Sequence, residues 1–271
     1  MKRVIIAVFL SFFLIVSCSG KKDEPKVKDN ITAKKPMAPI AEAQDIKIDE
    51  GNKYFLNGNF EKSIEYYSKA LDENRSVAYY NIGVAYYLLG RYEESEKYFR
   101  QAIDVKNDLK DAYVNLAVTL LRQKKVGEAV EVISKIEPTN AKEYQIMAEI
   151  YTIARDYPKA YYYFKKFSKS KDPLPSGFIN YGIFLKAMGD NDKGDKILNE
   201  TIKKLESSEF KDYEDFYQLA VGYFALKMYD KAILNAKYAI NLKKTYEALE
   251  IMVKSYEAIG KYGLAALAAE S

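Results

Sequence analysis

An internal repeat constrains the fold of this chain more than any other feature of its sequence. The stretches GNKYFLNGNFEKSIEYYSKAL at 51–71 and GVAYYLLGRYEESEKYFRQAI at 83–103 place small and bulky side chains in the same order. A column of mostly small residues continues at spacings of 32, 34, 31, 34, 38 and 33 residues. Its members are Gly51, Gly83, Ala117, Ala148, Gly182, Ala220 and Val253. A period of this length indicates units that bury their apolar faces against copies of themselves.

Each repeat carries the pattern of two antiparallel helices. One helical turn after the small column stand mostly aromatic residues, namely Tyr54, Tyr86, Leu120, Tyr151, Leu185, Tyr223 and Tyr256. A second small column follows at Ser63, Ser95, Ala129, Ala160, Gly194, Ala232 and Ala265. Small side chains let two helices approach closely, and bulky neighbours fill the space beside the contact. Gly58 and Gly90 stand where the first helix must stop and turn.

This pattern resembles the tetratricopeptide repeat, a helix–turn–helix unit of about 34 residues. The position that opens the repeat is tryptophan in that family and is Tyr79, Tyr113, Tyr144, Phe178, Phe216 or Leu249 in this chain, which has no tryptophan. The resemblance implies an all-α fold, a right-handed α-solenoid of about seven helical hairpins over residues 46–271. We expect the units near 46–75, 76–109, 110–140, 141–174, 175–212, 213–245 and 246–271.

The N-terminal stretch, residues 1–17, reads as an export signal. Lys2 and Arg3 precede an apolar run from Val4 to Val16, which is too short as a helix to cross a hydrocarbon core of about 30 Å. Residues 15–18, Ile-Val-Ser-Cys, resemble the lipobox of bacterial lipoproteins. The resemblance implies cleavage before Cys18, a diacylglycerol on its thiol and often an acyl group such as palmitate on its amine. The alternative is that Cys18 is an ordinary residue of a cleaved leader.

Residues 18–45 are expected to tether the repeats to that lipid. The stretch after Cys18 has six lysines, three prolines and no aromatic residue, so it cannot bury enough apolar surface to fold alone. A lipid on Cys18 would anchor the protein to a membrane of the bacterial cell envelope. Ser19, in place of an aspartate after the cysteine, favours the outer membrane, with the protein facing the periplasm.

A binding face is expected on the first helices of the hairpins. The column two residues before the small residue contains three asparagines and one glutamine, and the resemblance implies that this column lines a concave groove. Amides donate and accept hydrogen bonds at once, so a row of them can hold an extended peptide backbone. The predicted peptide- or protein-binding residues are Asn52, Tyr80, Asn81, Tyr87, Asn115, Asn180, Tyr217 and Gln218. The alternative is that these amides only hydrogen-bond neighbouring helices.

Composition disfavours the other classes of function. The chain has no histidine and one cysteine, so we predict no catalytic residue, no cofactor and no metal site. A formal net charge of +4 gives no strong preference for nucleic acid. The expected partners are other envelope proteins or peptides, and the membrane through the lipid on Cys18.

The C-terminal repeat offers a possible contact with a second copy of the chain. Its stretch YGLAALAAES has no polar outer face, so a homo-oligomer could form there; alternatively, its alanines pack on the preceding unit.

The expected function is a membrane-anchored adaptor that scaffolds other proteins. An assembly factor for a secretin, a pilus or an outer-membrane protein complex is the alternative, and a carboxylate-only cell wall glycan hydrolase is a remote one.

Overall fold

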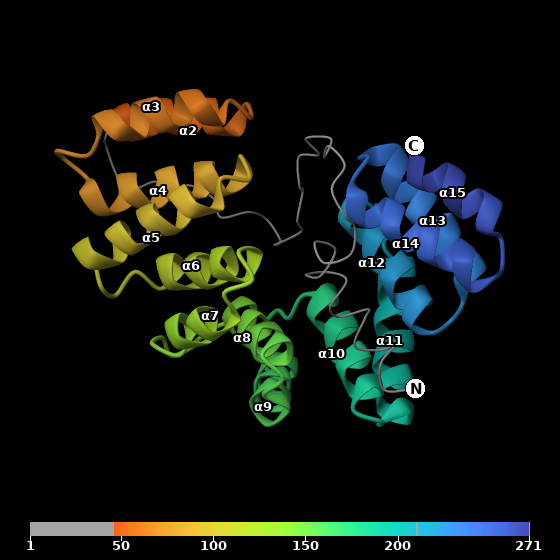
Figure 1. Ribbon diagram of the computed structural model, residues 1–271. Coiled ribbons are helices and arrows are strands. Elements are labelled where there is room, and N and C mark those ends of the chain that lie inside the picture. The colour runs from red at the N-terminus through yellow and green to blue at the C-terminus, as the bar shows by residue number, and fades with distance from the viewer. Residues whose placement is uncertain (1–45, 210, 271) are drawn as a thin grey trace. The chain divides into compact units, whose positions relative to one another are not determined.

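The structure, a computed structural model, describes residues 46–209 and 211–270. The predicted signal peptide, Cys18 and the tether lie outside these residues. Within the described part of the chain, the regular elements are fourteen α-helices, α2 to α15, and none is a strand (Figure 1). The all-α prediction is therefore confirmed.

The described residues divide into two compact bodies, with the boundary between Thr139 and Asn140. The first body contains α2 (Ile46–Leu56), α3 (Phe60–Lys69), α4 (Arg75–Leu88), α5 (Tyr92–Val105), α6 (Lys110–Arg122) and α7 (Val126–Ile133). The second body contains α8 (Ala141–Ile153), α9 (Tyr157–Ser168), α10 (Pro175–Ala187), α11 (Asn191–Glu206), α12 (Tyr213–Ala225), α13 (Tyr229–Leu242), α14 (Tyr246–Ala258) and α15 (Tyr262–Glu270).

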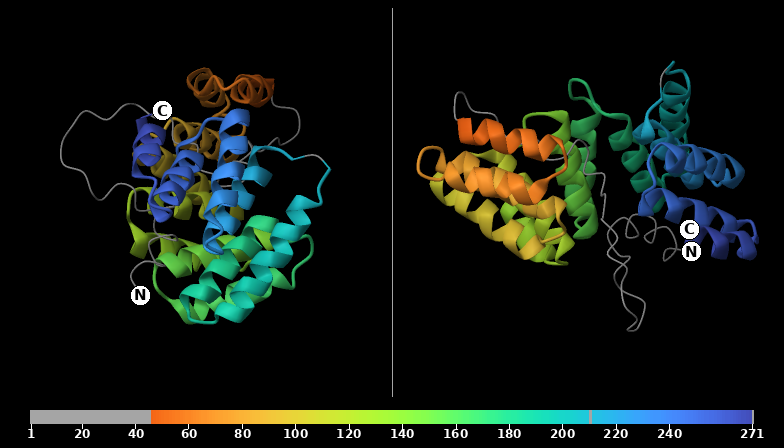
Figure 2. Two further views of the ribbon diagram at one scale, coloured as in Figure 1. Left: turned by 90° about the vertical axis from the view of Figure 1, so that its right-hand side faces the viewer. Right: turned by 90° about the horizontal axis from the view of Figure 1, so that it is seen from above.

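In each body the helices pair in chain order into antiparallel hairpins. In the first body α2 packs on α3, α4 on α5 and α6 on α7; in the second, α8 packs on α9, α10 on α11, α12 on α13 and α14 on α15. Within each body the second helix of most hairpins also packs on the first helix of the next, as α3 does on α4 and α13 on α14 (Figure 2). Each body is thus a stack of helical hairpins, as the repeat predicted.

The small columns of the sequence lie where the two helices of a hairpin meet. A Cβ atom built on Gly83 would lie 2.9 Å from the ring of Phe99, and one on Gly182 would lie 2.7 Å from Cγ of Leu198. Phe99 and Leu198 are fully buried. The absence of a side chain at the first position therefore makes room for the bulky side chain of the facing helix.

Every hairpin reverses direction through one residue with a positive φ. These turn residues are Gly58, Gly90, Lys124, Arg155, Gly189, Lys227 and Gly260, with φ between 62° and 94°. They recur at the spacings of the small column. In each turn the backbone N–H of this residue donates a hydrogen bond to a carbonyl in the last turn of the first helix, as Gly90 N–H does to the carbonyl of Tyr87 at 3.0 Å. Lys124, Arg155 and Lys227 adopt the left-handed conformation without being glycine, at a cost of about 1 kcal/mol each.

Candidate protein-binding face

In the first body, neighbouring first helices bring several of the predicted binding residues together. Tyr80 and Asn81 lie on α4 and Asn115 lies on α6, and all three are buried. The Asn115 side-chain amide donates to the Tyr80 hydroxyl at 2.9 Å. Burial raises the pKa of Tyr80, so its phenol stays protonated at neutral pH.

The remaining predicted residues of the first body lie beside this contact or in the hairpin before it. Tyr87, also on α4, is buried, and its hydroxyl accepts a hydrogen bond from Nε of Arg122 on α6 at 3.3 Å. Asn52 is half-buried on α2, where its side-chain oxygen accepts from the Tyr67 hydroxyl of the partner helix α3 at 2.8 Å. The hydrogen bond of Asn52 thus lies within its own hairpin, whereas that of Tyr87 joins two neighbouring hairpins.

In the second body, a chain of hydrogen bonds runs between α8 and α10. The Asn180 amide on α10 donates to Oε1 of Glu149 on α8 at 2.6 Å. Nε2 of Gln145 donates to the same carboxylate oxygen at 2.8 Å and to Oγ of Ser176 at 3.3 Å. Glu149, Gln145 and Ser176 were not predicted from the sequence; Glu149 directly follows the small residue Ala148, and this position could have indicated it.

Tyr217 and Gln218 lie on α12 and are both buried. The Gln218 amide donates to Oε1 of Glu214, one helical turn earlier, at 2.7 Å. Burial, and then the nearby charges of Glu247, Glu214 and Glu250, raise the pKa of Tyr217 well above its usual range. Burial also raises the pKa of Glu250 on α14 against the opposing effect of its ion pair with Lys254.

Asn52, Asn115, Asn180 and Gln218 each form a hydrogen bond with a side chain on the same helix or on a neighbouring helix. Bonds of this kind are what the alternative interpretation of the amide column expected. An amide has two N–H donors and two acceptor lone pairs, so a single such bond uses only part of the capacity of Asn52, Asn115, Asn180 or Gln218. Asn81 is fully buried on α4. Recognition of a peptide backbone by these residues stays a prediction.

In the C-terminal hairpin, Ala265 and Ala268 of α15 are buried, whereas Tyr262, Leu264 and Leu267 are exposed. The alanines therefore pack against α14, the first helix of their own hairpin, and packing on the preceding unit stays a prediction. Because Leu264 and Leu267 are exposed, contact of this repeat with a second copy of the chain stays a prediction.

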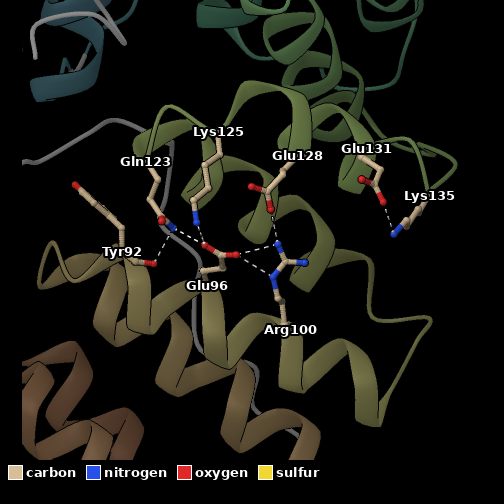
Figure 3. Close-up of polar contacts among 8 residues, drawn as sticks. All are labelled: Tyr92, Glu96, Arg100, Gln123, Lys125, Glu128, Glu131 and Lys135. Atoms are coloured by element: carbon tan, nitrogen blue, oxygen red, sulfur yellow. Dashed lines mark hydrogen bonds and ion pairs between the residues drawn. The ribbon is translucent and has the colours of Figure 1, made fainter. Parts of the chain in front are cut away.

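A separate polar cluster joins the second and third hairpins on the side of their second helices (Figure 3). Oε2 of Glu96 on α5 accepts from Nζ of Lys125 and Nε2 of Gln123, each at 2.8 Å. Oε1 of Glu96 accepts from Nε of Arg100 at 2.9 Å, and Arg100 in turn donates to Glu128 on α7 at 2.9 Å. Burial disfavours the charged form of Glu96, but the hydrogen bonds from Lys125, Arg100 and Gln123 outweigh it and lower the pKa of Glu96.

We expect Glu96→Ala to lower the free energy of unfolding by about 1 kcal/mol at neutral pH, because Lys125 and Gln123 lose their shared acceptor. A carboxylate with a lowered pKa stabilises the fold above the unfolded pKa of about 4.3, and this stabilisation disappears as the pH falls through the folded pKa. Urea unfolding should therefore show that the free energy of unfolding of Glu96→Ala differs from that of the unmodified protein at neutral pH, and that this difference is smaller at about pH 3.

The matched control for Glu96 is Glu131→Ala. Glu131 pairs with Lys135 at 3.3 Å, one helical turn along, and both side chains are more than half exposed (Figure 3). Exposed pairs of this kind contribute below about 0.5 kcal/mol. The stabilising role of the cluster would be contradicted if both variants lost the same free energy of unfolding. It would also be contradicted if the loss in Glu96→Ala did not change with pH.

Among the described residues, no helix is both long and apolar enough to cross a bilayer. The same residues contain no group of three or more His, Cys, Asp or Glu side chains placed to hold a metal ion.

Two family models of the tetratricopeptide repeat match the first body, at residues 50–77 and 76–108. A tetratricopeptide repeat protein from Parabacteroides merdae has a similar structure, with a TM-score of 0.64 and 16% identity over 82% of this chain and 89% of that one. No protein of curated function matches the sequence. The chain therefore contains tetratricopeptide repeats at residues 50–108, and its fold is that of a tetratricopeptide repeat protein.

Two further solved structures share this fold. PilW, described as a widely conserved type IV pilus biogenesis factor, has a TM-score of 0.60 and 16% identity over 79% of this chain and all of its own. PilF of Pseudomonas aeruginosa has a TM-score of 0.55 and 15% identity over 77% of this chain and 96% of its own. At these identities the likeness is one of fold.

Proposed function

We propose that this protein is a lipid-anchored adaptor of the bacterial cell envelope that holds other proteins on the first helices of its hairpins. The observation that carries the proposal is the row of polar side chains on neighbouring first helices. Asn115 meets Tyr80 in the first body, and Asn180 meets Glu149 in the second. Side chains fixed in this way are ordered before a partner arrives, which lowers the entropic cost of binding.

The binding residues are proposed separately for each body. In the first body they are Asn52, Tyr80, Asn81, Tyr87 and Asn115, and in the second they are Asn180, Tyr217 and Gln218. Of these, Asn52 and Asn180 are half-buried, and their amide capacity that is not used by bonds between helices would pair with the backbone of an extended partner segment. The other residues are buried, and they would hold in place the helices that present these two amides. Binding through the backbone suits partners with different sequences.

The envelope location rests on the lipobox-like sequence at residues 15–18 and on the resemblance in fold to PilW and PilF. A lipid on Cys18 would fix the protein to the outer membrane on its periplasmic side. Residues 18–45 would then act as a leash with a root-mean-square span of roughly 30 Å. The leash keeps both bodies near the membrane, where the effective concentration of other membrane-bound proteins is high.

A pilus or secretin assembly factor is the second candidate, and the similarity to PilW and PilF favours it. It is a special case of the adaptor, in which the partner is a subunit of the pilus machinery. The identity of the captured partner separates the two, because a general adaptor would also retain proteins outside that machinery.

The proposal is tested by affinity capture after crosslinking of the full, membrane-anchored chain in its own cells. The combined variant Asn52→Ala with Asn180→Ala removes two half-buried amides, one from each body. We expect it to retain its melting temperature within a few degrees. Each partner should be captured about fivefold less, because a partner held by one body loses one hydrogen bond of about 1 kcal/mol.

Asn199→Ala is the matched control for these amides, since Asn199 is an exposed asparagine on the second helix α11. It should capture partners like the unmodified protein. A third variant, Cys18→Ser, should no longer incorporate labelled fatty acid. Unchanged capture by the two-amide variant would refute the binding face, and unchanged labelling of Cys18→Ser would refute the anchor.

A further inference from the structure

Exposed apolar side chains are concentrated near the C-terminal end of the second body. Of the fifteen large hydrophobic residues that are exposed in the described part of the chain, seven lie between residues 234 and 267. The most regular group is on α13, where Leu234, Tyr238 and Leu242 are exposed to 50%, 46% and 57%. They are four residues apart and therefore form one line along the helix, here named the α13 stripe.

The α13 stripe lies on the outer part of the helix surface, where the ring of Tyr238 also contacts that of Phe216 on α12, with the ring centres 5.1 Å apart. Ala232, Ala236 and Ala239 are buried and pack α13 against α12 and α14. The fold itself does not require an apolar outer line, because the equivalent positions of the second helix α11 are the exposed, charged residues Lys196, Glu200 and Lys204. The stripe is thus a feature of this helix and not of the repeat.

Lysines lie next to the α13 stripe. Residues 227–244 contain five lysines and a single acidic residue, Asp230. Lys231 is three residues before Leu234, so it lies in line with the stripe at its N-terminal end, with its ammonium 5.0 Å from the ring centre of Tyr223 on α12. Lys237 lies beside the stripe toward α14, with its ammonium 5.8 Å from the ring centre of Tyr256.

We propose that the α13 stripe docks on the surface of an anionic phospholipid bilayer. A helix that lies in a membrane interface has an apolar centre line bordered by basic residues, which is the arrangement around Leu234, Tyr238 and Leu242. Long lysine stems let the ammonium groups reach headgroup phosphates beside the inserted leucines, and a tyrosine places its apolar ring and polar hydroxyl at the same boundary.

A bilayer fits this surface better than a protein partner. A stable protein interface buries about 800 Å² per partner with close shape complementarity, far more than three side chains in a line provide. A fluid lipid surface needs no matching shape, and its negative charge complements the five lysines. This contact would be separate from the lipid proposed on Cys18, so it goes beyond the proposed function and does not depend on it.

The absence of tryptophan from the sequence makes a local test possible. The full chain with Cys18→Ser, to exclude attached lipid, is given Tyr238→Trp in the stripe or, as the control, Lys97→Trp on the exposed face of α5. On mixing with vesicles of phosphatidylglycerol and phosphatidylcholine, emission from Tyr238→Trp should shift to shorter wavelength and be quenched by brominated lipid. Emission from Lys97→Trp should not change, although that variant carries the same N-terminal segment.

Further substitutions in the Tyr238→Trp chain separate charge from insertion. Each of Lys231→Gln and Lys237→Gln should weaken vesicle binding about fivefold at low salt. Leu234→Ser with Leu242→Ser should weaken it at least tenfold, because exposed leucine side chains drive insertion. All variants should keep the far-ultraviolet circular dichroism of the parent, since the altered side chains lie outside the core.

Three outcomes would overturn the proposal. Emission from Tyr238→Trp could stay unchanged with anionic vesicles, or Lys97→Trp could be quenched to the same degree, which would place the contact elsewhere. Sedimentation could instead reveal a lipid-free dimer that Leu234→Ser with Leu242→Ser dissociates, in which case the stripe is an interface between copies. Partner capture by the two-amide variant is measured separately, so a failure here leaves the proposed adaptor function standing.

Discussion

The Phe164→Ala variant is expected to lose about 3–5 kcal/mol of unfolding free energy, the largest effect of a single substitution that we predict. Phe164 on α9 is fully buried, and its ring centre lies 5.1 Å from those of Tyr181 and Phe184 on α10. Its removal would leave a cavity between the first two hairpins of the second body. Urea unfolding followed by circular dichroism measures the loss, which is a large part of the stability of an ordinary domain.

Tyr162→Ala is the control for Phe164, because it removes an aromatic ring from the same helix two residues earlier. Tyr162 is 53% exposed, so its loss should change the unfolding free energy by less than about 0.5 kcal/mol. Similar losses from the two variants would mean that helix formation, and not packing between hairpins, determines the stability of this region.

The Gly194→Ala variant is expected to lose about 1–3 kcal/mol, although alanine is the better helix former by about 1 kcal/mol. A Cβ on Gly194 of α11 would lie 2.7 Å from the carbonyl oxygen of Gly182 on α10 and 3.1 Å from the backbone nitrogen of Lys186. Backbone atoms cannot rotate away as a side chain can, so the two helices must separate. Thermal unfolding should show a melting temperature several degrees below that of the unmodified protein.

Gly263→Ala provides the opposite case, since a Cβ on Gly263 of α15 would meet no atom within 4 Å. Its melting temperature should stay unchanged or rise slightly, in line with helix propensity. If Gly194→Ala also stabilised the protein, the close approach of α10 and α11 would not be a determinant of the fold.

The helical hairpins and their contact residues could be predicted because the repeat is encoded locally. The small column marks the positions where Gly83 and Gly182 admit Phe99 and Leu198, and Gly58 and Gly90 stand at the turns that the sequence indicated. Sequence periodicity predicts such features well, since each depends on residues within one hairpin.

The period also explains some contacts of the candidate face that were not predicted. Asn115 and Tyr80 are 35 residues apart and Asn180 and Glu149 are 31 apart, close to one repeat in each case. One repeat length brings equivalent positions of neighbouring first helices side by side, so the register follows from the sequence. The choice of partner does not, because it depends on side-chain direction and on burial, as with Glu149.

The division into two bodies between Thr139 and Asn140 could not be predicted from the repeat spacing. Pro138 was a local sign that the helix before it must end, but the repeats on both sides keep the same pattern. The spacing of the small column across this boundary, 31 residues from Ala117 to Ala148, is close to the others, so the period does not mark the boundary.

The shared left-handed turn residue has a consequence for how such a chain can evolve. The hairpins reverse in the same way whether the residue is glycine, as at Gly90, or a charged residue, as at Lys124 and Arg155. A gene segment that encodes one hairpin can therefore be duplicated or deleted without requiring a new loop conformation. The number of hairpins is free to vary over generations while the geometry inside each is kept, and the stack can lengthen or shorten by whole hairpins.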